Sequence, residues 1–305
     1  MLVKGDMSAL LLAGLKTQFF QTYQTQPAEW DKVATLIPSD KDTEHYAWLG
    51  ALPGVREFLD ERQVADFSEY EYQIKNKTWE STVAVDRTLL EDDQYGQVAL
   101  RVKGLAAEAK QHLDILVFSL LAAGFTANCY DGTPFFGTHS VGKAQGAVQQ
   151  SNQAPAGAAL SSATLMAAIT AMRRTLNDQG RPMQIAPDTL VVPPELEWEA
   201  HQLLNSVFFP DPVQTASQQL PNNPLRGLLR LVVTPYLTNG ANWFLLDTQR
   251  AVRAVVLQMR RDFEFSALEA NSEEGFLRDR YLYGVRARYN VGYGDWRCAY
   301  GYAGN

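Results

Sequence analysis

Cys129 and His139 form the residue pair whose chemistry most resembles that of an active site. A cysteine activated by a histidine is a common covalent nucleophile, and both residues lie in a segment rich in turn formers and aromatics. The other histidines, His45, His112 and His201, are scattered, and none has a His or Cys at the short spacing of a metal pair. A buried thiol and a loop histidine explain the pair better than catalysis. We therefore expect no catalytic residue, no metal and no cofactor.

Charged clusters are the next candidates for chemistry. The acidic run Glu91–Asp93 could hold Mg²⁺, but no phosphate-binding glycine loop accompanies it, and it precedes a predicted helix, where carboxylates favour the positive end of the helix dipole. The short basic groups Arg173–Arg174, Arg260–Arg261 and Arg278–Arg280 are separated by acidic residues. We interpret them as solvated faces or ion pairs between subunits rather than as a nucleic-acid site.

The composition places these residues in a globular, acidic protein. The chain has 305 residues, 46% hydrophobic, and a net charge of −7, which argues against strong binding to nucleic acid. Its length suggests about two compact units. Two distant cysteines encode no disulfide framework, and neither a secretion signal nor a membrane span is apparent. We expect a protein of a reducing, cytosolic compartment.

One long amphipathic helix is the clearest predicted element. Val98, Val102, Leu105, Ala109 and Leu113 follow one another at spacings of three or four residues, and the pattern continues to Leu120 before Gly124. Few single-domain enzymes need such a rod as their second element. Before it, residues 1–53 predict an arm with a short amphipathic stretch. Residues 54–86 alternate with period two, change parity near Asn76 and are charged on both faces, which indicates a long exposed hairpin-like excursion.

The remaining sequence predicts an α+β unit and a closing strand. Between 151 and 254 we expect a helix capped by Ser161 or Ser162, a buried strand at Thr189–Val192, a helix from Pro193–Pro194 to Leu204, and strands at 228–233 and 243–246. Near the C-terminus, apolar residues alternate with polar ones from Tyr281 to Tyr293. This long strand should pack with the long helix, so that the second unit is discontinuous in sequence.

Several ordered stretches give the chain a resemblance to a known family. They are Tyr46–Gly50 with Pro53, Asn76–Glu80 with Thr82 and Val83, Glu91–Gly96, Gly124–Thr126 with Cys129–Gly132, and Phe135–Phe136. In these stretches the chain resembles the Mu-like phage major head subunit family, gene product T. The resemblance is dense over residues 46–140 and looser, in the same order, to the C-terminus.

The resemblance implies an α+β protein with the Hong Kong 97-type capsid fold. Its parts would be an N-terminal arm (1–53), an extended loop (54–86), a peripheral domain (87–150 and 255–305) with a spine helix at about 95–123, and an axial domain (151–254). Intersubunit contacts are then expected at charged and aromatic residues of the arm, the loop and the closing strand. These are Trp48, Arg56, Glu57, Arg62, Glu69, Lys75, Lys77, Trp79, Arg280 and Arg286.

The function implied by the resemblance is that of a major capsid protein of a Mu-like phage or prophage. Copies of the chain would form hexamers and pentamers of an icosahedral shell, first as a procapsid that later expands around double-stranded DNA. The implied partners are a portal, a maturation protease, a possible decoration protein and DNA in weak, non-specific contact. A scaffolding protein would be a separate polypeptide, because the sequence begins with the arm and shows no long charged helical leader.

Three alternatives accompany this interpretation. An encapsulin-type bacterial compartment shell would share the fold and hold enzyme cargo in place of DNA. An enzyme would use Cys129 with His139 or the acidic run, and Cys129→Ala would then abolish an activity while assembly survives. A prophage remnant would keep the fold without forming infectious particles.

Overall fold

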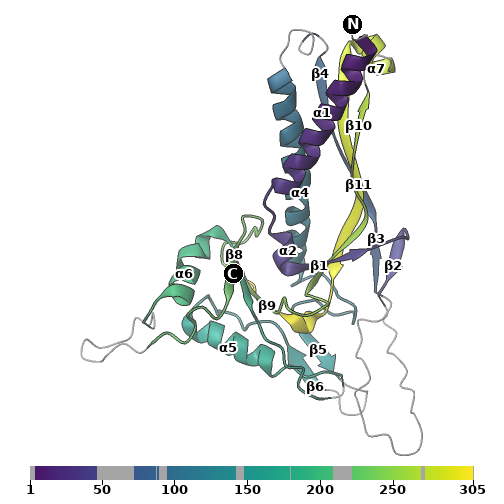
Figure 1. Ribbon diagram of the computed structural model, residues 1–305. Coiled ribbons are helices and arrows are strands. Elements are labelled where there is room, and N and C mark those ends of the chain that lie inside the picture. The colour runs from purple at the N-terminus through teal and green to yellow at the C-terminus, as the bar shows by residue number, and fades with distance from the viewer. Residues whose placement is uncertain are drawn as a thin grey trace, which may run out of the picture.

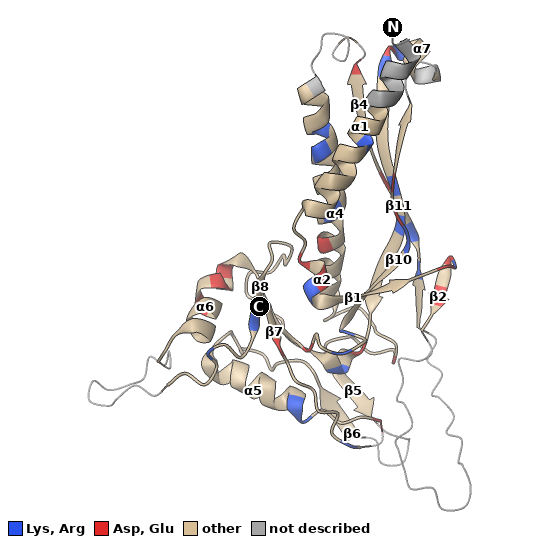
Figure 2. Ribbon diagram, viewed as in Figure 1, with Lys and Arg blue, Asp and Glu red and all other residues tan. Residues whose placement is uncertain are grey.

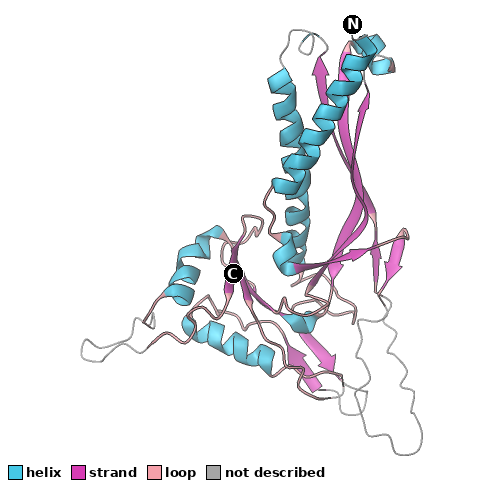
Figure 3. Cartoon of the chain, in the orientation of Figure 1, coloured by secondary structure: helices cyan, strands magenta, loops and turns pink. Residues whose placement is uncertain are grey.

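An elongated limb and a broader lobe make up the computed structural model, which describes residues 4–46, 72–86, 88, 95–141, 148–178, 180–208, 222–268 and 272–304 (Figure 1). Helices and strands are mixed in both parts, which confirms the predicted α+β class (Figure 3). None of the described helices is both long and apolar enough to cross a lipid bilayer.

The limb consists of two long helices on a twisted four-stranded sheet. The helices are α1 (Lys4–Thr25) and α4 (Tyr95–Ala123), and the strands are β1 (Ala34–Pro38), β4 (Lys77–Asp86), β10 (Val255–Leu268) and β11 (Arg280–Tyr293). The sheet order is β1-β10-β11-β4, with β1 parallel to β10 and the other pairs antiparallel. The helices α1 and α4 lie along the sheet and against each other (Figure 1).

The predicted long helix is confirmed as α4. Val98, Val102, Leu105, Ala109 and Leu113 are all buried, because their spacing directs them to the face that packs on α1 and the sheet. At 1.5 Å per residue, 29 residues make a rod of about 43 Å. Gly124 follows the last helical residue as expected. A side chain would not fit at this position, because a Cβ there would lie 2.8 Å from the ring of Phe136.

The lobe has its own sheet and its own hydrophobic core. Its strands are β7 (Thr189–Val192), β8 (Arg230–Val233), β9 (Trp243–Leu246) and β12 (Ala299–Tyr302), in the order β12-β9-β7-β8. Its helices are α5 (Ser162–Arg173) and α6 (Glu197–Asn205), the latter preceded by a 3-10 turn at Pro194–Leu196. Leu165, Met172, Leu190 and Trp243 are buried in one cluster between these elements. The predicted elements of the lobe are therefore confirmed, with Ser161 as the cap of α5.

Short elements complete the limb, the lobe and the region between them. Two small hairpin-like sheets pair β2 (Thr43–His45) with β3 (Gln73–Lys75) and β5 (Thr138–Val141) with β6 (Val148–Ser151). The others are α2 (Trp30–Val33), α7 (Glu273–Arg278) at the far end of the limb, and a 3-10 turn at Trp296–Cys298.

The N-terminal segment differs from its prediction in extent. The expected short amphipathic stretch is a helix of 22 residues, and β1 joins the limb sheet. Phe19 is fully buried, 5.6 Å from the ring of Phe265 on β10, and Leu15 is buried in the same core. This packing uses residues more than 240 positions away, so the local pattern could not reveal it.

The predicted hairpin-like excursion at 54–86 is wrong for its last residues. β4 pairs along its whole length with β11, from Lys77 opposite Tyr289 to Asp86 opposite Arg280, and it forms an edge of the limb sheet. The charges on β4 reflect this edge position. The break near Asn76 is confirmed, because it separates β3 from β4, and residues 47–71 lie outside the described part of the chain.

The chain crosses between its two parts more often than the sequence suggests. β10 follows the lobe strands directly, pairs with β11 in the limb, and was not among the predicted elements. After β11 the chain returns to the lobe, where β12 pairs with β9. Residues 299–302 therefore lie in the lobe sheet, although they belong to the range 255–305 that was expected to pack with the long helix.

Candidate functional site

Of the ten predicted contact residues, five lie in the described part of the chain and five do not. Trp48, Arg56, Glu57, Arg62 and Glu69 lie outside the described residues. The other five lie on neighbouring strands of the limb or beside it: Lys75 on β3, Lys77 and Trp79 on β4, and Arg280 and Arg286 on β11.

Trp79 joins β4, β11 and α4. Its indole N–H donates to the carbonyl of Tyr289 over 3.0 Å, and its ring lies 4.4 Å from that of His112. A hydrogen bond of 2.7 Å joins His112 Nδ1 and the Tyr289 hydroxyl. Burial lowers the pKa of His112 and raises that of Tyr289. A half-open cavity of about 200 Å³ lies beside this cluster and is lined by both apolar and charged side chains. Trp79 is thus half-buried within one subunit, and the Nζ of Lys77 lies 5.9 Å from its ring.

Arg280 and Arg286 are exposed on the outer part of the sheet. Arg280 bonds Asp86 at 3.0 Å, directly across the strand pair, and Arg286 lies opposite Glu80 on one side and Glu264 on the other. Exposed pairs of this kind contribute at most about 1 kcal/mol each. They favour the strand register.

Cys129 and His139 come together with Asp131 in a buried cluster. His139 is fully buried, with Nδ1 2.6 Å from Asp131 Oδ2 and Nε2 3.2 Å from the carbonyl of Phe135. The Cys129 thiol donates to Asp131 Oδ1 at 3.1 Å and not to His139. Burial and the neighbouring Asp131 raise the pKa of this thiol. A buried thiol held as a donor is a poor nucleophile, so the arrangement favours a structural role.

Asp131 organises that cluster as an acceptor. Burial alone would raise its pKa, but hydrogen bonds from His139, Thr133 and Cys129 outweigh it and hold the pKa well below its usual range. The ring of His139 stacks on Trp296 with centroids 4.0 Å apart. The three side chains Cys129, Asp131 and His139 could hold a metal by residue type, with ligand atoms within 4.8 Å. However, Asp131 already hydrogen-bonds both other residues at 2.6 and 3.1 Å, so the donors are satisfied by one another.

Arg297 is a second buried charge, next to Trp296. Its guanidinium bonds Asp178, Asp295 and the hydroxyl of Tyr130. Burial would lower the pKa of Arg297, but the charge of Asp295, with Tyr130 and Asp178, raises it. Because Asp178 follows α5 and Tyr130 follows α4, this group fastens the lobe to the limb.

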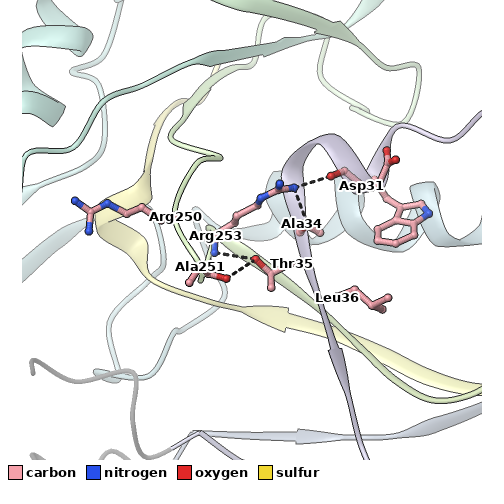
Figure 4. A pocket seen from close by; sticks show the side chains of 8 residues that line it. Asp31, Ala34, Thr35, Leu36, Arg250, Ala251 and Arg253 are labelled. Atoms are coloured by element: carbon pink, nitrogen blue, oxygen red, sulfur yellow. Dashed lines mark hydrogen bonds between the residues drawn. The ribbon is translucent and has the colours of Figure 1, made fainter.

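A hollow of about 300 Å³ at the junction of limb and lobe is lined by Arg250 and Arg253 (Figure 4). Arg253 donates to the carbonyls of Asp31 and Ala34, and to that of Thr248. Arg250 donates to the carbonyl of Met183 and contacts Asp247. Both cations already bind groups of their own chain, so the hollow is a structural joint and not a built anion site.

Exposed apolar side chains are candidate contact residues that sequence reasoning missed. Phe276 on α7 is 87% exposed, Trp198 on α6 is 79% exposed, and Leu100 on α4 is 67% exposed. Large apolar residues at these positions suit surfaces that other molecules cover. The signal in the sequence was weak, because a large apolar residue at a helical position is more often buried than exposed.

Comparison with known families and proteins identifies the relatives of the chain. The family described as Mu-like prophage major head subunit gpT matches residues 9–159, 154–237 and 238–304. The chain is 26% identical over 304 residues to the Mu-like prophage FluMu major head subunit of Haemophilus influenzae, covering 99% of this chain and 75% of that protein. It is also 26% identical to the major capsid protein of Escherichia phage Mu, covering 98% and 74%.

Solved structures agree with the sequence relatives. The procapsid protein of bacteriophage JBD30 is 29% identical, with a TM-score of 0.57 over 98% of this chain and 75% of that one. The JBD30 capsid gives 27% identity and a TM-score of 0.54 over 70% and 92%. A virus-like particle from Pyrococcus furiosus, 10% identical with a TM-score of 0.52, shares the fold alone. These matches do not favour the bacterial compartment shell as an alternative.

Proposed function

The chain belongs to the Mu-like prophage major head subunit gpT family and is a major capsid protein with the Hong Kong 97-type fold, and from this we propose that its copies form the hexamers and pentamers of an icosahedral phage head. As a capsid component it is a structural protein and not an enzyme. The end product is a closed shell built from many copies of one chain. Identical subunits close a shell by burying heterologous interfaces around rotation axes.

The observation that carries the proposal is a family match along almost the whole chain, joined to a shape with unpartnered apolar surfaces at both ends. Trp198 lies on the lobe and Phe276 at the far end of the limb, and both are more than three-quarters exposed. Neighbouring subunits of a shell can cover such exposed aromatic side chains. A shell supplies neighbours at both ends.

The parts of the fold correspond, in this proposal, to the parts of a capsid subunit. The limb serves as the peripheral domain with α4 as its spine helix, and the lobe serves as the axial domain near the centres of the rings. Residues 1–53 serve as the arm, of which α1 and β1 pack into the limb, and residues 54–76, before β4, serve as the extended loop. The limb and lobe each have a hydrophobic core, which supports this division.

The proposed partners follow the assembly route of a phage head. A separate scaffolding protein directs a procapsid in the cytoplasm of the bacterial host, a portal occupies one vertex, and a maturation protease precedes expansion. JBD30 has a procapsid, and its capsid is decorated with minor capsid protein trimers. We extend both features to the head that this chain forms.

Double-stranded DNA is the proposed content of the shell, held without strong contacts. The net charge of −7 opposes tight phosphate binding by every copy, which would hinder release of the genome. The isolated subunit should therefore show only weak DNA binding at about 150 mM salt. Tight binding that weakens steeply with added salt would contradict this part of the proposal.

Electron microscopy with light scattering tests the proposed function. The chain is expressed alone and together with the candidate scaffolding protein from the same phage genome. The proposal predicts uniform shells of megadalton mass, at least in the presence of the scaffold. A strict monomer or small oligomer in both samples would favour a non-assembling prophage remnant.

A further inference from the structure

The start of α6, with the 3-10 turn that precedes it, exposes an aromatic ring and carboxylates. Glu195, Trp198, Glu199 and Gln202 recur at helical spacing, and all four are exposed. Trp198 is the most exposed large side chain of the lobe, at 79%. We call these four residues the acidic face.

The chemistry of the acidic face suits an arginine. A guanidinium can lie flat on an indole ring while its N–H groups donate to carboxylates beside the ring. Glu195 precedes Trp198 by three residues and Glu199 by four, the spacings at which helical side chains are neighbours, so Glu195 is the carboxylate placed beside the indole. Glu199 follows Trp198 directly and adds negative charge next to the ring without facing it. Glu199 makes no ion pair with any residue in the described part of the chain.

Three exposed arginines gather at the opposite end of the lobe. Arg173 and Arg174 end α5. The chain then folds back, with Asn177 N–H donating to the Arg181 carbonyl at 2.8 Å and Met183 N–H to the Thr175 carbonyl at 3.0 Å, which brings Arg181 beside them. We call these three residues the basic end.

The basic end has no counter-charge of its own. None of its guanidinium groups forms an ion pair or hydrogen bond with another described residue. The negative end of the helix dipole accounts for one cation, but three exposed guanidinium groups lie within the nine residues 173–181. The nearby carboxylate Asp178 is already bonded to Arg297.

The two surfaces point away from each other. Leu176, just after α5, exchanges hydrogen bonds with Gln150 of β6, which places the basic end beside the β5–β6 pair. α6 lies at the other end of the lobe, and Figure 2 shows acidic residues on α6 and a basic residue at the far end of α5. One subunit therefore cannot bring them together, but successive subunits can.

We propose that the acidic face of one subunit binds the basic end of the next copy, head to tail, around each ring of the shell. The inference rests on the proposed function and names the contact that closes the ring. A contact between two different surfaces of the same chain is heterologous, which is the type that generates closed rings. Trp198 is the anchor, and the charge pairs set the direction of the ring.

Charge reversal tests the contact with an internal control. One variant carries Glu195→Arg with Glu199→Arg, a second carries Arg173→Glu with Arg174→Glu, and a third carries all four substitutions. The third variant keeps the net charge of −7, because the two Glu→Arg substitutions change it by +4 and the two Arg→Glu substitutions change it by −4. Assembly is followed by light scattering and electron microscopy under the conditions in which the wild type assembles.

Each two-residue variant should need about tenfold more protein to assemble, since like charges then face each other across the contact. The four-residue variant should recover assembly near the wild-type concentration. Wild-type assembly by both two-residue variants would overturn the contact but leave the shell function intact. Failure of the four-residue variant to recover, with an unchanged melting temperature, would also overturn it.

A milder variant guards against damage to the fold. Trp198→Ser removes the anchor without changing charge, and the exposed position should leave the melting temperature unchanged. The contact predicts weaker assembly for this variant, and unchanged assembly would argue against it. If the wild type itself stays monomeric with its scaffold, the proposed function fails first, which separates the two conclusions.

Discussion

Cys129 and His139, the pair that first suggested catalysis, belong to a buried polar network with a structural role. Cys129, Asp131 and His139 satisfy one another in a closed cluster against Trp296, and Arg297 binds two carboxylates on the other side of that ring. Such networks rigidify the places where loops meet, because every donor and acceptor depends on its neighbours.

Asp131→Asn should destabilise the subunit by about 2 kcal/mol at pH 7, since the carboxylate accepts several hydrogen bonds that are strengthened by its charge. The pKa of Asp131 is lowered in the folded state, so its contribution is complete above the unfolded value of about 3.9 and is lost as pH falls below it. Urea unfolding of both proteins at pH 7 and pH 3 measures this.

The exposed Asp40→Asn is the matched control for that change. Its unfolding free energy should equal that of the wild type at pH 7. An Asp131→Asn variant whose deficit stays constant between pH 7 and pH 3 would contradict the proposed role of the charge.

Ser161→Ala should cost about 1 kcal/mol of stability in the lobe. The Ser161 hydroxyl accepts from Thr164 N–H, while Thr164 Oγ1 accepts from Ser161 N–H, so the substitution removes half of a capping box. Ser162→Ala, one residue later, should change stability by only a few tenths of that. Equal effects of the two substitutions in denaturant unfolding would show that the cap does not matter.

At the scale of elements, periodicity predicted individual helices and strands but not how distant segments pair and pack. The spacing of Val98 to Leu120 predicted α4 and its end before Gly124, and the alternation from Tyr281 to Tyr293 predicted β11. The partners of β4 and β12 could not be read in the same way, because strand pairing joins residues distant in sequence. α1 was underestimated for the same reason, since Phe19 packs on Phe265.

The candidate contact residues show a similar limit. Sequence reasoning named Arg280 as a contact residue and interpreted Arg173–Arg174 as solvated or intersubunit. It missed Trp198 and Phe276, because an apolar residue on a helix is more often buried than exposed. Only the packed structure shows which helical face remains free.

Gly294→Ala should destabilise the junction between β11 and the 3-10 turn by more than about 2 kcal/mol. A Cβ at residue 294 would lie 2.0 Å from the carbonyl oxygen of Arg253, which is backbone and cannot move aside easily. Gly284→Ala is the control in β11, because its Cβ would meet the flexible Thr82 hydroxyl at 3.1 Å. Thermal melting that ranks the two substitutions in the opposite order would contradict this packing argument.

At the scale of the whole molecule, shape explains function better than any pocket does. The limb is a thin layer of two helices on one sheet, and the lobe joins it through Arg297 and Arg253. Because buried charges fix the limb to the lobe, the orientation of a contact made by the limb determines the orientation of a contact made by the lobe. That property lets one chain define the curvature of a shell through repeated contacts.

An image reconstruction of particles purified from cells that express the chain with its scaffold tests the central claim most directly. The account predicts closed icosahedral shells in which one chain fills both hexameric and pentameric rings, with the α4 helix of each copy visible as a rod. Particles without icosahedral order, or a shell in which this chain is absent from the rings, would contradict it.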